Sequence, residues 1–172
     1  MAPDPTSAGP DAAPPPQRSL LLSRREYVAG FDRLLGLARH ELRIFDPDLS
    51  ELGLNSPQKI GLLQNLILRG ENRILIAVHD TGHVLQRCPR LMSLLGSFYG
   101  SVLIYQTTGI AARVQDCFAL ADADHLVRRP VTRQPRGVLI LNDPKEGFPM
   151  RDRFNEIWAH SQPTVAPSAA GL

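Results

Sequence analysis

Five ionisable side chains in the first half of the sequence are of the types that bind metal ions or transfer protons. They are Asp46, Asp48, His79, Asp80 and His83. Asp46 and Asp48 follow one short apolar run, and the other three residues follow a second one. Short apolar runs of this kind are typical of buried strands. Carboxylates and imidazoles that lie together can act as acid and base, or bind a divalent metal. These five residues are therefore the candidate catalytic group.

Simpler interpretations of the same residues remain open. Asp80 also suits the cap of a following helix, and Asp46-Pro47-Asp48 also suits a plain turn. His79 and His83 lie four residues apart, but the intervening Thr-Gly argues against one continuous helical face. A pocket for another kind of ligand is favoured over a metal site, so we predict no metal and no cofactor.

Arginine is the second residue type that could bind a ligand, because the chain has 17 arginines and only two lysines. Guanidinium groups grip phosphate or carboxylate with paired hydrogen bonds. Four arginines lie between residues 128 and 136, and two more flank Cys88-Pro89. The residues predicted to bind a ligand are Arg87, Arg90, Thr107, Thr108, Arg128 and Arg129. A GC-rich genome or a solvated surface would explain the same arginines.

Length and composition describe one ordinary globular domain of 172 residues, with 43% hydrophobic residues and a formal net charge of +2. No apolar run approaches the roughly 18 residues that span a bilayer, and no signal peptide is visible, so we expect a cytoplasmic protein. The small net charge gives no long-range electrostatic attraction for nucleic acid. The arginine cluster contains no aromatic residue that could stack on bases. The expected partners are a phosphate-bearing ligand, a protein or a second copy of the chain. Nucleic acid stays an open alternative.

The two ends of the chain differ in composition from its middle. Residues 1–17 are rich in proline and alanine, and residues 162–172 carry few large apolar side chains. Such segments cannot bury enough apolar surface to offset their ordering entropy, so we expect two disordered tails. Residues 18–161 then form the single folded domain.

Periodicity within this domain predicts helices that alternate with strands. Helices are predicted over 24–39, 57–70, 84–98 and 149–160, and strands over 19–22, 41–45, 74–78, 101–105, 114–121, 125–129 and 137–141. Ser23 and Ser56 are the predicted caps of the first two helices. The alternation predicts an α/β fold with three layers, α/β/α, and a mostly parallel sheet flanked by helices. In such a sheet the strand ends near residues 46, 79 and 107 meet at one edge.

From Ser23 to Ser161 this order of elements resembles one half of the phospholipase D-like family. That family later has a strand pair that carries its catalytic motif, and then a closing helix. Here the segment Phe154-Asn-Glu-Ile-Trp158 fits the closing helix. The chain is most similar to a bacterial branch with Phe-Asp-Pro-Asp, Val-His-Asp-Thr and Arg-Cys-Pro-Arg-Leu segments, which carries no assigned function.

The resemblance implies a catalytic motif of histidine, any residue, lysine, four residues and aspartate. The register that fits this chain places Gln115 at the histidine, Cys117 at the lysine and Asp122 at the aspartate. A glutamine amide cannot form the phosphohistidine intermediate that the family uses, and a neutral thiol supplies no fixed positive charge. The resemblance therefore implies that the phosphodiesterase motif is lost, and we expect no such activity.

Three functions follow from these observations. The first is a non-catalytic phospholipase D-like module that binds a phosphate-bearing ligand or a protein partner. The second is a hydrolase with a relocated site at the five Asp and His residues after the strands. The third is a regulatory domain that acts beside a catalytic domain, with the proline-rich N-terminus as a hinge. We favour the first.

Overall fold

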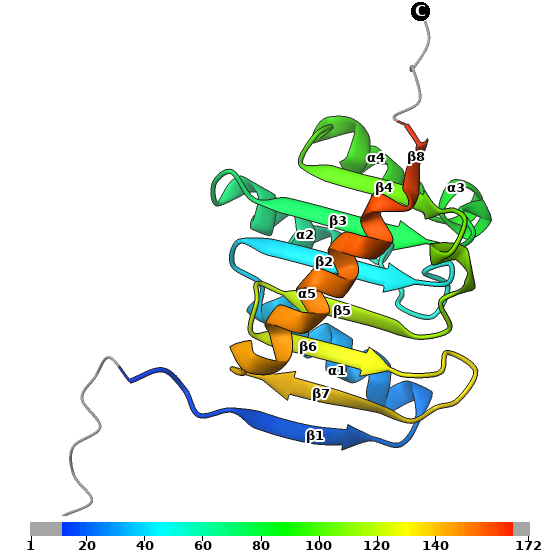
Figure 1. Ribbon diagram of the computed structural model, residues 1–172. Helices are drawn as coiled ribbons and strands as arrows, with labels where there is room; N and C mark the ends of the chain where they lie inside the picture. Colours follow the sequence, from blue (N-terminus) through cyan, green and yellow to red (C-terminus); the bar gives the residue numbers. More distant parts are fainter. Residues whose placement is uncertain (1–11, 167–172) are drawn as a thin grey trace, which may run out of the picture.

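The computed structural model describes residues 12–166, which form one eight-stranded sheet with helices on both faces (Figure 1). The strands are β1 (Gln17–Leu21), β2 (Glu41–Asp46), β3 (Arg73–Val78), β4 (Val102–Thr107), β5 (Cys117–Ala121), β6 (His125–Arg129), β7 (Gly137–Leu141) and β8 (Ser161–Val165). Their order across the sheet is β1-β7-β6-β5-β2-β3-β4-β8. The predicted α/β class is therefore confirmed.

The sheet is mostly antiparallel, so the prediction of a mostly parallel sheet is wrong. Among the described strands, the parallel pairs are β2–β3 and β3–β4, and the other pairs are antiparallel. After β4 the chain passes through a short 3₁₀ turn (Ala111–Arg113) and returns beside β2. The turn at 122–124 then makes β6 antiparallel to β5, as a short hairpin must. Helices alternate with strands only as far as β4, and from β4 to β7 no α-helix separates one strand from the next. The inference from alternation to parallel strands therefore does not apply beyond β4.

Helices cover the two faces of the sheet unequally. Helices α1 (Arg24–Leu37), α2 (Pro57–Leu68), α3 (Gly82–Arg87) and α4 (Pro89–Ser97) lie on one face, and α5 (Pro144–Ala159) crosses the other diagonally (Figure 1). Each face has its own apolar core, and the larger core lies beneath α1 to α4. The predicted three layers are thus present, although one layer is a single helix.

Local sequence signals set most helix boundaries. The hydroxyls of Ser23 and Ser56 accept from backbone N–H groups three residues later and cap α1 and α2. Pro89 divides the third predicted helix into α3 and α4. Helix α5 begins five residues earlier than predicted, because Asp143 caps it and Pro144 occupies its first turn.

The face of α5 that carries Phe154 and Trp158 packs on the sheet, as the closing helix of the resemblance implies. Phe154 is buried, and the half-buried Trp158 stacks on Tyr105 of β4 with ring centroids 4.0 Å apart. At the other end of α5, a Cβ atom on Gly147 would collide with the carbonyl of Ala123. Helix α5 is therefore fitted closely against the turn between β5 and β6.

Strand β8 extends the folded domain beyond the predicted boundary at residue 161. It pairs antiparallel with β4 and buries Val165, where the sequence predicts a disordered tail over 162–172. Pairing with an edge strand satisfies backbone groups in a way that composition does not reveal. Residues 12–16 have no regular structure, and the predicted tails at 1–11 and 167–172 lie outside the described residues. No helix within 12–166 is both long and apolar enough to cross a membrane.

Candidate functional site

The C-terminal ends of the parallel strands β2, β3 and β4 lie side by side (Figure 1). His79 Nδ1, just beyond β3, lies 2.6 Å from the hydroxyl of Thr107 at the end of β4. The backbone N–H groups of His79 and Asp80 both donate to the carbonyl of Pro47, beyond β2. The structure therefore brings these three strand ends together, as parallel neighbours require.

His79 is half-buried, and both of its ring nitrogens are engaged. Nε2 lies 2.9 Å from the carbonyl oxygen of Val114, which can only accept, so Nε2 carries a proton. In the neutral ring, Nδ1 then accepts from the hydroxyl of Thr107. The ring packs edge-on against Phe45. His79 thus links β3, β4 and the loop before β5, and its nitrogens are used within the protein.

Asp46 and Asp48 form a hydrogen-bonded turn after β2. Asp46 is buried, and its Oδ1 accepts from the backbone N–H groups of Asp48 and Leu49. Leu49 has a φ of +66°, which this turn imposes. Asp48 accepts from both the backbone N–H and the hydroxyl of Ser50. Burial raises the pKa of Asp46, and the two amide hydrogen bonds oppose this rise.

The other residues predicted at the strand ends lie nearer the surface. Asp80 is exposed and accepts from the backbone N–H of Gly82, as a helix cap does. His83 is half-buried in α3, and Thr108 donates its hydroxyl to the carbonyl of His160. Among residues 12–166, no three His, Cys, Asp or Glu side chains are grouped closely enough to hold a metal ion.

A polar hollow lies beside these strand ends, where β2 and β6 end. We call it the Arg129 hollow. Its volume is about 190 Å³. It is lined by Arg24, Asp46, Pro47, Asp48, Ser50, Glu51, Arg129, Thr132 and Arg133. These residues come from the start of α1, the turn after β2 and the segment around the end of β6. Segments far apart in the chain therefore assemble it.

Arg129 has two buried donors without acceptors. The residue is 2% exposed, its Nη2 donates to Glu51 at 2.9 Å, and its guanidinium carbon lies 4.8 Å from the centre of the Tyr27 ring. Nε and Nη1 have no hydrogen-bond partner in the part of the chain that the structure describes. An unsatisfied buried donor costs of order 1–3 kcal/mol. Arg43 also has Nε and Nη1 without hydrogen-bond partners, but its Nη1 lies 2.8 Å from a carboxylate oxygen of Glu41 in an ion pair, so both unpartnered donors of Arg129 lack a nearby charge.

Cys117 lies directly opposite Arg129 in the β5–β6 pair. Its buried thiol donates to the hydroxyl oxygen of Tyr27, with a separation of 3.6 Å. Burial, and secondarily the charge of Asp46, raises the pKa of Cys117 to about 11, so the thiol stays protonated at neutral pH. Burial also raises the pKa of Tyr27 well above its usual 10.0. Neither group is ionised to act as a nucleophile at neutral pH.

The other two positions of the degenerate motif flank β5 at opposite ends. Gln115 is exposed, and its carbonyl accepts from the backbone N–H of Thr132, which lines the Arg129 hollow. Asp122 follows the far end of β5 and has a φ of +57°. Its carboxylate accepts from the backbone N–H groups of Arg39, His40 and Glu41 at 3.1, 2.8 and 3.1 Å. Asp122 therefore fastens the β5–β6 turn to the start of β2.

The arginines predicted to bind a ligand are dispersed over the molecule. Arg128 is bonded to the buried carboxylate of Asp116. Arg87 and Arg90 are exposed on α3 and α4. Of the six residues predicted to bind a ligand, Arg129 is the one that lines the Arg129 hollow.

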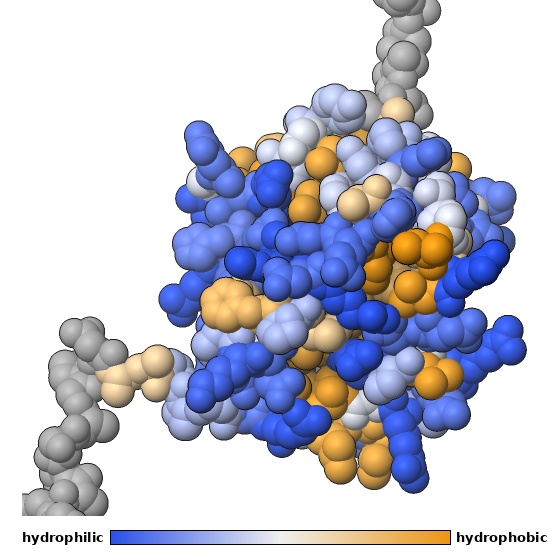
Figure 2. All heavy atoms as spheres, viewed as in Figure 1, coloured by the Kyte–Doolittle hydropathy of each residue, from blue (hydrophilic) through white to orange (hydrophobic). Residues whose placement is uncertain are grey.

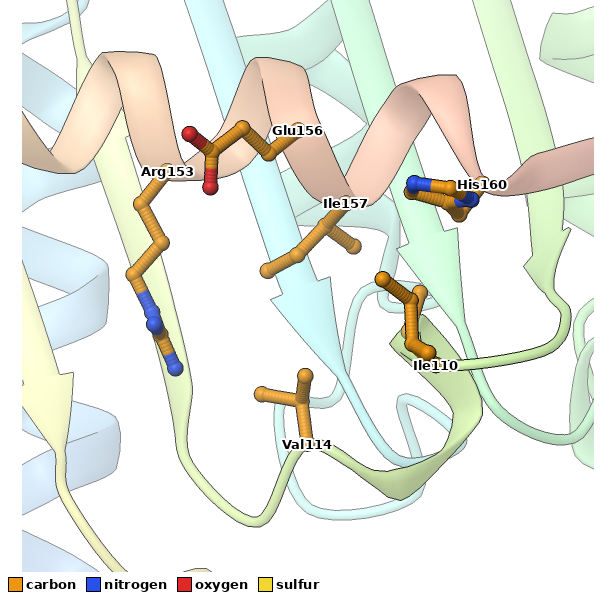
Figure 3. A pocket seen from close by; sticks show the side chains of 7 residues that line it. Ile110, Val114, Arg153, Glu156, Ile157 and His160 are labelled. Carbon is orange, nitrogen blue, oxygen red and sulfur yellow. The ribbon is translucent and has the colours of Figure 1, made fainter.

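A second hollow, of about 300 Å³, lies between the C-terminal half of α5 and the loop after β4 (Figure 3). Figure 3 shows Ile157 pointing from the helix into this space, above Val114 and Ile110 of the loop. Its arginine, Arg153, donates to Asp116 at 2.7 Å. Arg153 keeps one buried donor without a partner among the described residues, Nε, whereas Arg129 keeps two, so we place the candidate site at the Arg129 hollow.

Sequence reasoning missed three residues around Arg129. Arg24 and Tyr27 read as ordinary positions of the first helix, and Glu51 lies in a loop without a motif. Their importance comes from long-range packing, which local pattern does not encode. The one available signal was the arginine cluster at 128–136, which contains both Arg129 and Arg133.

A comparison with protein families finds one model, described as a domain of unknown function (DUF7931), that matches residues 23–166. No curated protein matches the sequence.

Solved structures share the fold at low sequence identity. Nuc from Salmonella typhimurium, a phospholipase D family member, has a TM-score of 0.61 at 13% identity, over 88% of this chain and 100% of Nuc. NucT from Helicobacter pylori has a TM-score of 0.57 at 11% identity, over 87% of this chain and 99% of NucT. TrmBL2, an archaeal chromatin protein with a novel mode of DNA binding, has a TM-score of 0.62 at 11% identity, over 86% of this chain and 54% of TrmBL2. The predicted resemblance to phospholipase D-like proteins is therefore confirmed at the level of fold.

Proposed function

We propose that this chain, which belongs to the DUF7931 family and has a phospholipase D-like fold, is a non-catalytic module that binds a phosphate-bearing ligand in the Arg129 hollow. The observation that carries the proposal is the pair of buried donors on Arg129, Nε and Nη1, which lack acceptors among the described residues. Phosphate oxygens are strong acceptors for guanidinium N–H groups. Because Arg129 lines the hollow, a phosphate group bound there would bring acceptor oxygens to this guanidinium.

Arg129 replaces the positive charge that the degenerate motif has lost. The resemblance implies that the motif lysine holds the phosphate, and Cys117 occupies that position here. Arg129 lies opposite Cys117 on the neighbouring strand, so a cation remains beside this position although another strand contributes it. A retained cation without a nucleophilic histidine favours binding over phosphoryl transfer.

The charges around the hollow indicate what else the ligand carries. Glu51 is shared between Arg24 and Arg129, and the buried Asp46 already accepts from two backbone amides. Asp48 and the exposed Arg133 remain as a carboxylate and a cation in the same hollow. A phosphate ester with hydroxyl groups fits this pair, because hydroxyls can donate to Asp48 while phosphate accepts from arginine.

The hydrolase alternative, built on the Asp and His residues after the strands, has less support. His79 uses both ring nitrogens within the protein, and Asp46 is engaged by the turn that follows it. A regulatory domain that acts beside a catalytic domain stays a second alternative, and it could use the same ligand site.

An NMR titration with glycerol 3-phosphate tests the proposal, with glycerol as the probe that lacks phosphate. We expect shift changes concentrated at residues 46–51 and 129–133 with the phosphate ester and none with glycerol. Arg129→Met should weaken binding at least tenfold, about 1.4 kcal/mol. Methionine retains much of the side-chain volume, and Glu51 is not left as an unpaired buried charge, because its side chain is 30% exposed and still pairs with Arg24.

Two further variants control this experiment. Arg133→Ala is at an exposed position of the hollow and should weaken binding without loss of stability, whereas Arg87→Ala on α3 should leave binding unchanged. Shift changes centred on Arg87 and Arg90 would move the site to α3 and α4. An absence of shift changes up to about 20 mM ester, where even millimolar affinity saturates, would reject the proposal.

A further inference from the structure

The two edges of the sheet are protected unequally. Within residues 12–166, β8 has only β4 as a neighbour, and β1 has only β7 (Figure 1). An exposed edge strand is a template for pairing with another chain, and natural proteins blunt such edges with proline, bulges or charge. Strand β8 contains Pro163, pairs irregularly with β4, and buries its valine, Val165. The β8 edge is therefore protected.

Strand β1 lacks this protection. Its pairing with β7 is regular from Gln17 to Leu21, and its one charged residue, Arg18, is 3.8 Å from Glu146 in an ion pair. Leu20 is 74% exposed, and Leu22, directly after the strand, is 62% exposed. Figure 2 shows apolar side chains along this lower edge of the molecule. Exposed leucines beside an unpaired strand edge are typical of an interaction surface.

We propose that two copies of this chain associate through β1, edge to edge across a two-fold axis, and so form one continuous sheet. An antiparallel edge strand is complementary to its own copy, because a two-fold axis presents the same patch from both sides. In the register centred on Leu20, Leu20 of one copy faces Leu20 of the other. Arg18 of each copy then lies opposite Leu22 of the other copy. The two leucines are then covered, and the stem of Arg18 packs on an apolar neighbour.

The charges along β1 also fit a second copy as the occupant. In this register the two Arg18 side chains are four residues apart along the strands, about 14 Å at ~3.4 Å per residue, which exceeds the screening length of ~8 Å at physiological salt. Each Arg18 also has Glu146 nearby, so little repulsion opposes association. Five paired residues and two leucines bury less than the roughly 1,200 Å² of a standard interface, so we expect a weak dimer.

Sedimentation equilibrium of the full chain tests this interface. Between about 5 μM and 1 mM, the average mass should rise from 19.0 kDa towards twice that value. Leu20→Lys places a charge at the centre of the interface and should raise the dissociation constant at least tenfold. Leu68→Lys is the matched control, because Leu68 is 63% exposed on α2, far from β1 in the sheet order.

A second variant, Leu22→Lys, repeats the test outside the strand, and circular dichroism confirms that each variant is folded. A constant mass of one chain up to 1 mM would overturn the proposal, as would unchanged association of both Leu20→Lys and Leu22→Lys. A loss of association in Leu68→Lys would assign the contact to α2 instead. Growth beyond a dimer would also contradict it, because a two-fold contact closes after two copies.

Discussion

The two ends of β5 differ in how well they match the motif that the resemblance implies. At one end, Cys117 is a protonated thiol opposite Arg129, beside a polar hollow. At the other end, Asp122 accepts three backbone hydrogen bonds and joins two segments of the fold. The position with a structural task has kept the residue that the resemblance implies, and the positions with chemical tasks have not. Retention of the aspartate alone therefore reports on the fold rather than on activity.

The largest expected effect comes from Asp122→Ala. The change removes three hydrogen bonds from a carboxylate to backbone N–H groups and places alanine at a φ of +57°. We expect a loss of roughly 3 kcal/mol in the free energy of unfolding, measured by urea denaturation. The folded fraction should still bind glycerol 3-phosphate, because Asp122 does not line the hollow.

Asp122→Asn is the matched control for this prediction. Asparagine tolerates a positive φ and retains one side-chain acceptor, so its loss of stability should be clearly smaller. Equal stability of Asp122→Ala and the wild type would contradict the structural task of Asp122. Loss of ligand binding in the folded alanine variant would break the contrast between the two ends of β5.

An intermediate effect should appear at alkaline pH and depend on Cys117. Burial raises the pKa of this thiol from an ordinary 9.0 to about 11, so the folded state holds the proton more tightly than the unfolded chain. This stabilisation is fully present below pH 9 and is lost as the pH rises from 9 to 11. The free energy of unfolding should fall by about 1.4 kcal/mol per pH unit in this window.

Cys117→Ala separates this contribution from those of the other groups. Burial also raises the pKa values of Tyr27 and Cys88, and this effect of burial remains in the variant, whereas the smaller contribution of Cys117 to the pKa of Tyr27 is lost. Urea denaturation at pH 8 and pH 10 should therefore show a fall in stability that is about 1 kcal/mol larger in the wild type than in the variant. Parallel pH profiles would mean that the thiol ionises in the folded protein as it does in the unfolded chain.

The smallest effect is expected for Gln115→His, which restores the histidine of the motif. Gln115 is exposed, so stability should change by less than about 0.5 kcal/mol. Hydrolysis of bis-p-nitrophenyl phosphate should stay at background, because the neutral thiol of Cys117 still occupies the lysine position. Turnover by the wild type that disappears in Gln115→Ala would contradict the non-catalytic function.

The sequence predicts the elements of this fold better than their arrangement. Caps at Ser23 and Ser56 and apolar periodicity locate α1, α2, β2 and β3 closely, because these signals act over one or two turns of chain. The position of β5 beside β2, and hence the antiparallel half of the sheet, depends on contacts between residues about 75 apart. No local pattern specifies such a pairing.

The candidate site shows the same limit. The predicted meeting of His79 with Thr107 follows from parallel neighbouring strands and is seen in the structure. The Arg129 hollow instead needs Glu51 from one loop and Arg24 from the first helix, and their charges read as ordinary surface residues in the sequence. The arginine cluster contains two residues that line the hollow, Arg129 and Arg133, but it does not reveal the residues around them.

The pairing of β1 with β7 also determines when this protein can finish folding. Residues 17–21 pair with partners roughly 120 residues later in the chain. At translation rates of about 5–20 residues per second, β1 leaves the ribosome of the order of ten seconds before β7 exists. During that interval its apolar segment has no native partner, and β7 of a neighbouring nascent chain could accept it. Synthesis on crowded polysomes is therefore the stage at which strand exchange between copies would arise.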